Sequence, residues 1–142
     1  MKKIILTLLA AIAVITAADA QKVKSPLLPV EVKSAWISRY PTMESVNWEK
    51  AKSNYEARWV SKSGKNRSVL FTPEGKFIEQ VNAIPVCALP PAVIVYVKEH
   101  YKGFKIDEAG IITDAKDALM FEAVVNSKNL VFDDKGNFVK RN

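Results

Sequence analysis

The chain carries the same turn twice, as FTPEGKF at residues 71–77 and as FDDKGNF at residues 132–138. In each copy an aromatic residue ends one strand, a polar turn places glycine where φ must be positive, and a second aromatic begins the return strand. The two glycines, Gly75 and Gly136, are 61 positions apart. A fixed offset between two stretches is the signature of a repeated structural unit. The pattern therefore predicts one unit built twice.

Two short helices are predicted ahead of these turns, at the same offset. In each segment apolar residues recur four positions apart, which places them on one helix face. They are Val32, Trp36 and Tyr40 in the first segment, and Val93, Val97 and Tyr101 in the second. Prolines precede both segments, where the first helical turn tolerates them, and Pro41 and Gly103 follow as helix breakers.

After each helix, apolar and polar residues alternate with the period of a β-strand, as in residues 55–59 and 121–125. Length differences between the two copies fall in expected loops, which supports a duplication. The predicted fold class is α+β: each unit is one helix and four antiparallel strands, and together they form one sheet of about eight strands with both helices on one face. The predicted core is Trp36, Tyr40, Val97, Tyr101, Trp48, Tyr55, Trp59, Phe71, Phe121 and Phe132.

The first 20 residues have the three parts of a secretory signal peptide. Lys2 and Lys3 precede a short apolar run, and Ala18-Asp19-Ala20 forms a cleavage site. We expect an exported, periplasmic protein with no stable membrane span after cleavage; a retained membrane anchor is the alternative. Residues 21–27 are predicted to form a tail. Residues 28–142 are predicted to form one domain of two repeats, 28–84 and 89–142.

The chain has a net charge of +6 and one cysteine. Basic residues exceed acidic ones only in the first half, which favours an acidic protein partner. Nucleic acid is not expected as a partner of an exported protein. Cys87 lies in an apolar stretch and is predicted to be a buried small side chain, with an intermolecular disulfide as the alternative.

Catalytic and cofactor chemistry is not predicted. His100 is the only histidine and lies near a helix end, where a solvated histidine is favoured by the helix dipole. Asp133 and Asp134 lack the spacing of a calcium loop and belong to a turn. Glu56 and Glu122 occupy equivalent outward positions, but cross-strand surface pairing is a better interpretation than a pair of acid/base carboxylates. We expect no enzyme activity, metal site or cofactor.

A protein-binding surface is the preferred hypothesis. The sheet face opposite the helices combines charged and apolar residues, as binding surfaces do, and the two edges of an open sheet can accept a partner strand. A basic hairpin at residues 62–67 offers a further contact. A small-ligand carrier with a pocket between the helix layer and the sheet is the alternative. The candidate binding residues are Glu56, Arg58, Val60, Lys62, Lys65, Arg67, Glu122 and Val124.

The order of these motifs resembles the PepSY-like domain. The residues that carry the likeness are Tyr40-Pro41, Val46-Asn47-Trp48-Glu49, Tyr55-Glu56-Ala57, the turn at residues 71–77, and Leu89-Pro90 before the second helix. The resemblance covers essentially all of the expected mature chain, residues 21–142. It implies an exported bacterial protein with a fold similar to the β-lactamase inhibitor protein, a tandem repeat, an open curved sheet, and a role in binding or inhibiting another envelope protein.

Overall fold

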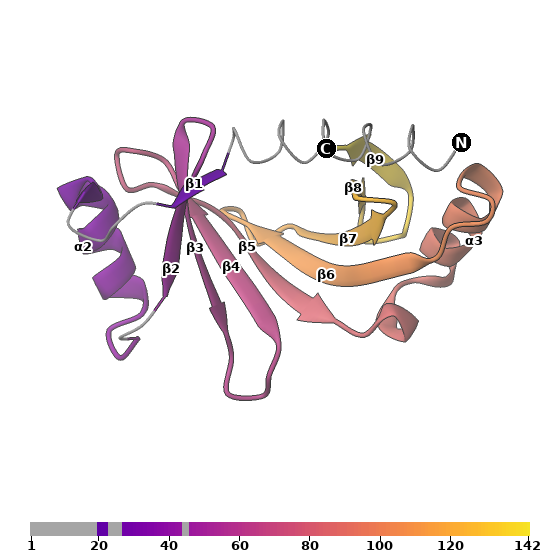
Figure 1. Ribbon diagram of the computed structural model, residues 1–142, viewed down its shortest axis with the longest axis horizontal. Coiled ribbons are helices and arrows are strands. Elements are labelled where there is room, and N and C mark those ends of the chain that lie inside the picture. Colours follow the sequence, from indigo (N-terminus) through magenta and orange to yellow (C-terminus); the bar gives the residue numbers. More distant parts are fainter. Residues whose placement is uncertain (1–19, 23–26, 44–45) are drawn as a thin grey trace, which may run out of the picture. The chain divides into compact units, whose positions relative to one another are not determined.

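The computed structural model describes residues 20–22, 27–43 and 46–142. Within these ranges it contains two α-helices, a short 3-10 helix and nine β-strands (Figure 1). In chain order they are β1 (Ala20–Lys22), α2 (Val30–Arg39), β2 (Asn47–Ala51), β3 (Asn54–Val60), β4 (Asn66–Phe71), β5 (Phe77–Ile84), η2 (Val86–Ala88), α3 (Pro91–His100), β6 (Ile106–Asp114), β7 (Leu119–Val125), β8 (Lys128–Phe132) and β9 (Phe138–Arg141).

The strands form one sheet in which each strand neighbours the next along the chain, from β1 to β9. β2 pairs antiparallel with β1 and with β3, and the consecutive strands from β5 to β9 also pair antiparallel. The predicted α+β class is therefore confirmed. One strand was not predicted: Ala20–Lys22 pairs with β2, so part of the segment expected to be a tail belongs to the sheet.

The chain folds as two compact units. The first contains the described residues up to Trp59 together with Leu70–Phe77. Its helix, α2, follows Pro29 and ends where the Tyr40 N–H donates to the Trp36 carbonyl at 2.8 Å. Trp36 packs against three aromatic rings at centroid distances of 4.6 to 5.5 Å, those of Tyr40, Trp48 and Trp59. Such ring pairs contribute about 0.5–1.5 kcal/mol each beyond the area they bury.

The second unit contains Val60–Val69 and Ile78–Asn142. Its helix, α3, has Pro91 in its first turn and ends where the Tyr101 N–H donates to the Val97 carbonyl at 2.8 Å. Val93 and Val97 pack on aliphatic and aromatic side chains from β6, β7 and β8. The buried strand residues of this core are Ala109, Ala123, Val125, Leu130 and Phe132. Both predicted helices are confirmed, including the proline before each and the tyrosine at each end.

The predicted core is largely correct. Trp36, Trp48, Phe71, Val97 and Phe132 are buried. The other five aromatic residues of the predicted core are half-buried, and two of them, Tyr101 and Phe121, pack against the buried cluster of the second unit. The prediction for Cys87 is wrong: it lies on the one-turn helix η2 and is exposed.

The backbone geometry of the two repeated turns explains why each contains a glycine. Gly75 has φ of +80° and Gly136 has φ of +86°, a region that side chains with a Cβ rarely adopt. A Cβ on Gly75 would lie 2.5 Å from the Glu31 carbonyl oxygen at the start of α2. A Cβ on Gly136 would lie 2.9 Å from the Ala92 Cβ at the start of α3. Each turn therefore contacts the first turn of its own helix, and Glu31 and Ala92 are again 61 positions apart.

The length differences between the copies lie at two hairpins, partly in the loops, as predicted, and partly in longer strands. Trp48 pairs with Ala57, and the corresponding pair in the second unit is Ala109 with Ala123. The second connection is longer because β6 and β7 extend further before they turn at residues 115–118. The β7–β8 turn is as short as it can be: Asn126 and Ser127, with φ of 50° and 60°, make a two-residue turn.

Candidate partner-binding surfaces

The eight candidate residues fall into three groups. The first is a charged cluster on the outer face of β2 and β3. Glu49 and Glu56 stand directly opposite each other in the ladder, an arrangement that is unfavourable for two like charges. Arg58 resolves it, because its Nη2 lies 2.8 Å from Glu56 Oε2 and its Nε lies 3.7 Å from Glu49 Oε2. Glu56 and Arg58 therefore bind each other along one strand, and the part of this cluster that matches the predicted cross-strand pairing is the longer contact between Arg58 and Glu49.

The second group lies on the β3–β4 hairpin. Val60 ends β3 with 63% of its surface exposed, and Lys62, Lys65 and Arg67 follow as exposed side chains. None of these three cations forms an ion pair with another described residue. No acidic residue occurs in the whole segment 60–69. The hairpin consequently presents three positive charges that no carboxylate within the described part of the chain neutralises.

The tip of this hairpin is held by its own hydrogen bonds. The Ser61 N–H donates to the Lys65 carbonyl at 2.8 Å, and the Gly64 N–H donates to the Ser61 carbonyl at 2.9 Å. The Ser61 hydroxyl accepts from the Lys65 N–H at 3.2 Å and lies 2.9 Å from the Ser63 hydroxyl. Gly64 supplies the positive φ, 78°, that the turn requires. The basic side chains therefore extend from an ordered turn rather than from a structureless loop.

The third group, Glu122 and Val124, lies on the β7 face that points away from α3. Their neighbours Ala123 and Val125 pack in the α3 core, so alternation places Glu122 and Val124 on the other side. Both are half-buried. Glu122 stands between Gly110 on β6 and Val131 on β8. At these two positions the face is therefore only partly exposed to solvent.

Two residues of that face were missed by sequence reasoning. Ile112 is 4% exposed and Val131 is 2% exposed, although both alternate with residues that face α3. Strict alternation along β8 could have placed Val131 on this face. The burial of Ile112 could not be predicted in this way, because the sequence pattern predicts no strand within residues 102–120.

The residues considered for chemistry have structural roles. His100 is exposed, stacks on Tyr96 with ring centroids 4.0 Å apart, and its Nδ1 lies 3.0 Å from the Tyr96 carbonyl oxygen. Among the described residues, no group of three or more His, Cys, Asp or Glu side chains is arranged to hold a metal ion. No helix in the described part of the chain has both the length and the apolar character to span a bilayer.

Asp133 holds the repeated turn of the second unit. Its Oδ1 accepts from the backbone N–H groups of Asn137 and Lys135, at 2.8 and 3.0 Å, and its Oδ2 accepts from the Asn137 side chain at 3.0 Å. These bonds, first those from Asn137, lower the pKa of Asp133 below its ordinary value. The interpretation of this segment as a turn is confirmed.

Comparison with known proteins shows the fold. No protein-family model matches the chain, and no curated protein matches it in sequence. Several solved structures from Bacteroides are similar, including the following three. A protein from Bacteroides eggerthii described as periplasmic has a TM-score of 0.65 at 19% identity, over 80% of this chain and 87% of its own. A DUF2874 family protein from Bacteroides uniformis has a TM-score of 0.65 at 20% identity, over 80% and 88%.

The third similar structure is a BLIP-like protein from Bacteroides fragilis, with a TM-score of 0.57 at 20% identity, over 79% of this chain and 83% of its own. These values establish a shared fold with a BLIP-like protein, as the resemblance implied. The identities are too low to carry a function from one protein to another. The PepSY-like assignment stays a prediction.

Proposed function

We propose that the chain is an exported, non-enzymatic protein-binding module of the periplasm, and that its β3–β4 hairpin contacts an acidic surface of another exported protein. The observation that carries the proposal is a set of three cations, Lys62, Lys65 and Arg67, on a hairpin with a hydrogen-bonded turn next to the exposed Val60; none of the three forms an ion pair within the described residues. An apolar residue beside fixed charges is a frequent arrangement at protein interfaces.

An exported location is supported by the signal-like residues 1–20 and by the periplasmic description of a protein with the same fold. A binding role is supported by the BLIP-like description of another. The recurrence of the helix and turn positions at an offset of 61 supports a tandem duplication as the origin of the two repeats. PepSY-like membership and cleavage after Ala20 belong to the same proposal.

The hairpin is tested by a capture experiment. Cys87 is exposed and is the only cysteine, so a biotin–maleimide reagent labels the periplasmic protein at one position far in sequence from the hairpin. The labelled protein is used to capture partners from periplasmic extract, which are identified by mass spectrometry. We expect a saturable protein partner that is lost in the variant Lys62→Glu/Lys65→Glu/Arg67→Glu, because reversed charges repel an acidic surface.

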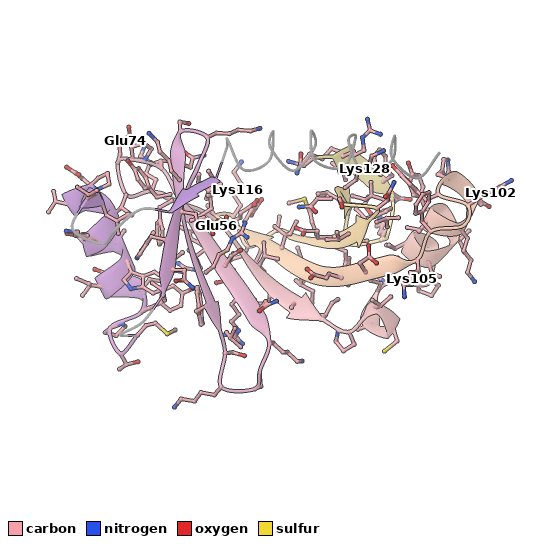
Figure 2. The ribbon with its side chains drawn as sticks, viewed as in Figure 1. Glu56, Glu74, Lys102, Lys105, Lys116 and Lys128 are labelled. Carbon is pink, nitrogen blue, oxygen red and sulfur yellow. The ribbon has the colours of Figure 1, made fainter. Side chains whose placement is uncertain are left out.

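The matched control is Lys102→Glu/Lys105→Glu/Lys116→Glu, which changes the net charge by the same amount at three exposed lysines outside the hairpin (Figure 2). A partner retained by the control and lost by the hairpin variant supports the proposal. A partner that both variants retain assigns binding to another surface. Recovery of a small molecule in place of any protein would favour the carrier hypothesis instead.

A further inference from the structure

The free edge of β9 is a second, separate feature of the sheet. β9 is the last strand in the sheet order and pairs, within the described residues, only with β8. All four of its residues are exposed. Unpaired strand edges are templates for the addition of another strand. Proteins usually protect such edges with a bulge, a proline or a short strand, and here a register shift between β8 and β9 leaves Val139 without a partner residue.

The ladder fixes which backbone groups of β9 point outward. Asn129 and Asn142 exchange both backbone hydrogen bonds, at 2.8 and 3.1 Å, so they form a hydrogen-bonded pair. The next pair, Leu130 with Arg141, is therefore of the other type, and the N–H and C=O of Arg141 point away from β8. These groups are available to a further strand.

The corresponding strand of the first predicted repeat, β5, already accepts a strand. Ile78 and Gln80 of β5 lie 61 positions before Val139 and Arg141. The Ile78 carbonyl accepts a hydrogen bond from the Ala115 N–H at 3.0 Å, and Gln80 pairs with Thr113 of β6. The backbone positions that β5 uses to bind β6 thus correspond to the outward positions of β9, which has no such neighbour among the described residues.

The positive charges and the exposed aromatic ring of β9 indicate which kind of strand could pair with it. Lys140 and Arg141 are exposed, on opposite faces of β9, and neither forms an ion pair within the described residues. Phe138, 40% exposed, is held by a parallel stack on Tyr96 at 4.9 Å and offers an apolar surface at the start of the strand. Opposite charges across a strand pair are favourable, and like charges are not.

We propose that β9 binds, by strand addition, an extended segment of another protein in which two consecutive acidic residues are flanked by apolar ones. A second copy of this chain is a poor occupant, because antiparallel pairing of two β9 strands would bring Lys140 and Arg141 of each copy close to those of the other. The inference rests on the proposed function only in assuming a protein partner. It concerns a different surface from the hairpin.

The test uses fluorescence anisotropy with the protein purified from the periplasm. The probe is a fluorescein-labelled, acetylated octapeptide with two central glutamates, two valines on either side of them and a threonine at each end. A second probe has lysine in place of glutamate. A third keeps the glutamates but carries N-methyl groups on alternate peptide nitrogens, which removes the donors that a strand needs.

We expect saturable binding of the glutamate probe alone. Arg141→Pro should weaken it about tenfold or more, because proline removes the outward N–H without removing a bond to β8. Arg141→Ala keeps that N–H and separates the backbone effect from the charge. Lys140→Glu/Arg141→Glu should weaken binding by about tenfold, and the control Lys102→Glu/Lys105→Glu, at two exposed lysines outside both proposed surfaces, should change it by less than about twofold. An unchanged urea midpoint checks that each variant is folded.

Three results would overturn the inference. They are equal binding of the N-methylated or lysine probe, unchanged affinity in Arg141→Pro, and no saturable binding of the glutamate probe at about millimolar concentration. Dimerisation that Arg141→Pro abolishes, seen by sedimentation, would assign the edge to a second copy and also overturn it. Each of these results leaves the hairpin capture experiment free to succeed, so the two proposals can fail separately.

Discussion

The two units share a backbone plan but fill it with different side chains. All three tryptophans of the chain lie in the first unit, where they form one cluster. At the equivalent positions the second unit has small aliphatic residues, each buried. The pairs are Trp36 and Val97, Trp48 and Ala109, and Trp59 and Val125. The same helix-on-sheet arrangement is therefore stabilised by aromatic bulk in one unit and by close aliphatic packing in the other.

At one pair of equivalent helix positions, the difference in side-chain size is reversed, and the larger residue lies in the second unit. In the first unit Ala35 is small, and the Arg39 guanidinium lies 3.9 Å from the centre of the Phe77 ring, a cation–π contact. In the second unit Tyr96 stands at the position of Ala35. Its ring stacks between those of His100 and Phe138, the residues equivalent to Arg39 and Phe77. Side-chain volume is thus redistributed within each unit rather than conserved position by position, as expected if total volume and pattern matter more than identity.

The largest effect is expected at Trp48, which is 5% exposed and contacts both Trp36 and Phe71. Trp48→Ala should lower the free energy of unfolding by about 3–5 kcal/mol, because the cavity is too large for its surroundings to fill. Ala109→Trp at the equivalent position should also destabilise, by about 1–3 kcal/mol or more through overpacking. Urea unfolding followed by circular dichroism measures both.

Tryptophan fluorescence adds a check on Trp48→Ala, because its signal comes from the first unit alone. If the first unit loses stability independently, the fluorescence midpoint falls below the circular dichroism midpoint. The control is Val60→Ala, which removes an exposed side chain and should change stability by less than about 0.5 kcal/mol. A loss at Trp48 no larger than this control would show that the aromatic cluster is not what stabilises the first unit.

The turn glycines should give an intermediate effect. Gly75→Ala and Gly136→Ala combine left-handed strain with a close approach, and each should cost about 2–4 kcal/mol. We expect Gly75→Ala to cost more, since the nearest atom is the Glu31 backbone oxygen, whereas Ala92 offers a side-chain carbon. Chemical unfolding of the two variants side by side measures the difference.

Gly64→Ala measures the left-handed backbone strain alone, without the close contact to a helix that Gly75→Ala and Gly136→Ala also create. Gly64 has φ of +78°, and nothing lies within 4 Å of where its Cβ would be. Its replacement should cost only the left-handed penalty of about 1–2 kcal/mol. If all three alanine variants lose the same stability, the contact between each turn and its helix contributes nothing, and the repeated packing is incidental.

Much of the fold could be predicted because its signals are local. The turn at residues 71–77, the spacing of Val32 and Trp36, and the prolines before each helix depend on near neighbours in the chain. What could not be predicted depends on register. That Arg58 bridges two glutamates follows only once Glu49 stands opposite Glu56. The exposure of Cys87 depends on how η2 lies, which an apolar stretch does not specify.

The candidate surfaces divide in the same way. The hairpin cations were predictable, because a loop without carboxylates keeps its charges exposed whatever the rest of the chain does. The half-burial of Glu122 was not, since it depends on the strands on both sides of β7. For the same reason the pairing of β1 with β2 was missed: three residues are too few to show a period.

The smallest expected effect concerns the acidic turn of the second unit. Thr72 is the equivalent of Asp133, and its hydroxyl accepts from the Lys76 N–H at 3.2 Å, a bond that does not titrate. Because folding lowers the pKa of Asp133, its contribution to stability is present above the unfolded value of 3.8 and is lost as the pH falls through the lower folded value. The pH dependence of this turn is therefore confined to acid conditions.

Asp133→Thr copies the first unit's turn into the second and should remove this dependence. As the pH drops from about 4.5 to about 2.5, the urea midpoint of the wild type should fall more steeply than that of the variant. Above about pH 4.5 the difference between the two midpoints should not change with pH. Glu74, whose pKa is also lowered, first by a backbone hydrogen bond within its own residue and then by one to Thr72, titrates in both proteins and cancels in the comparison. Parallel midpoint curves across that range would mean that the three hydrogen bonds to Asp133 do not depend on its charge. The two turns would then differ in sequence but not in electrostatics.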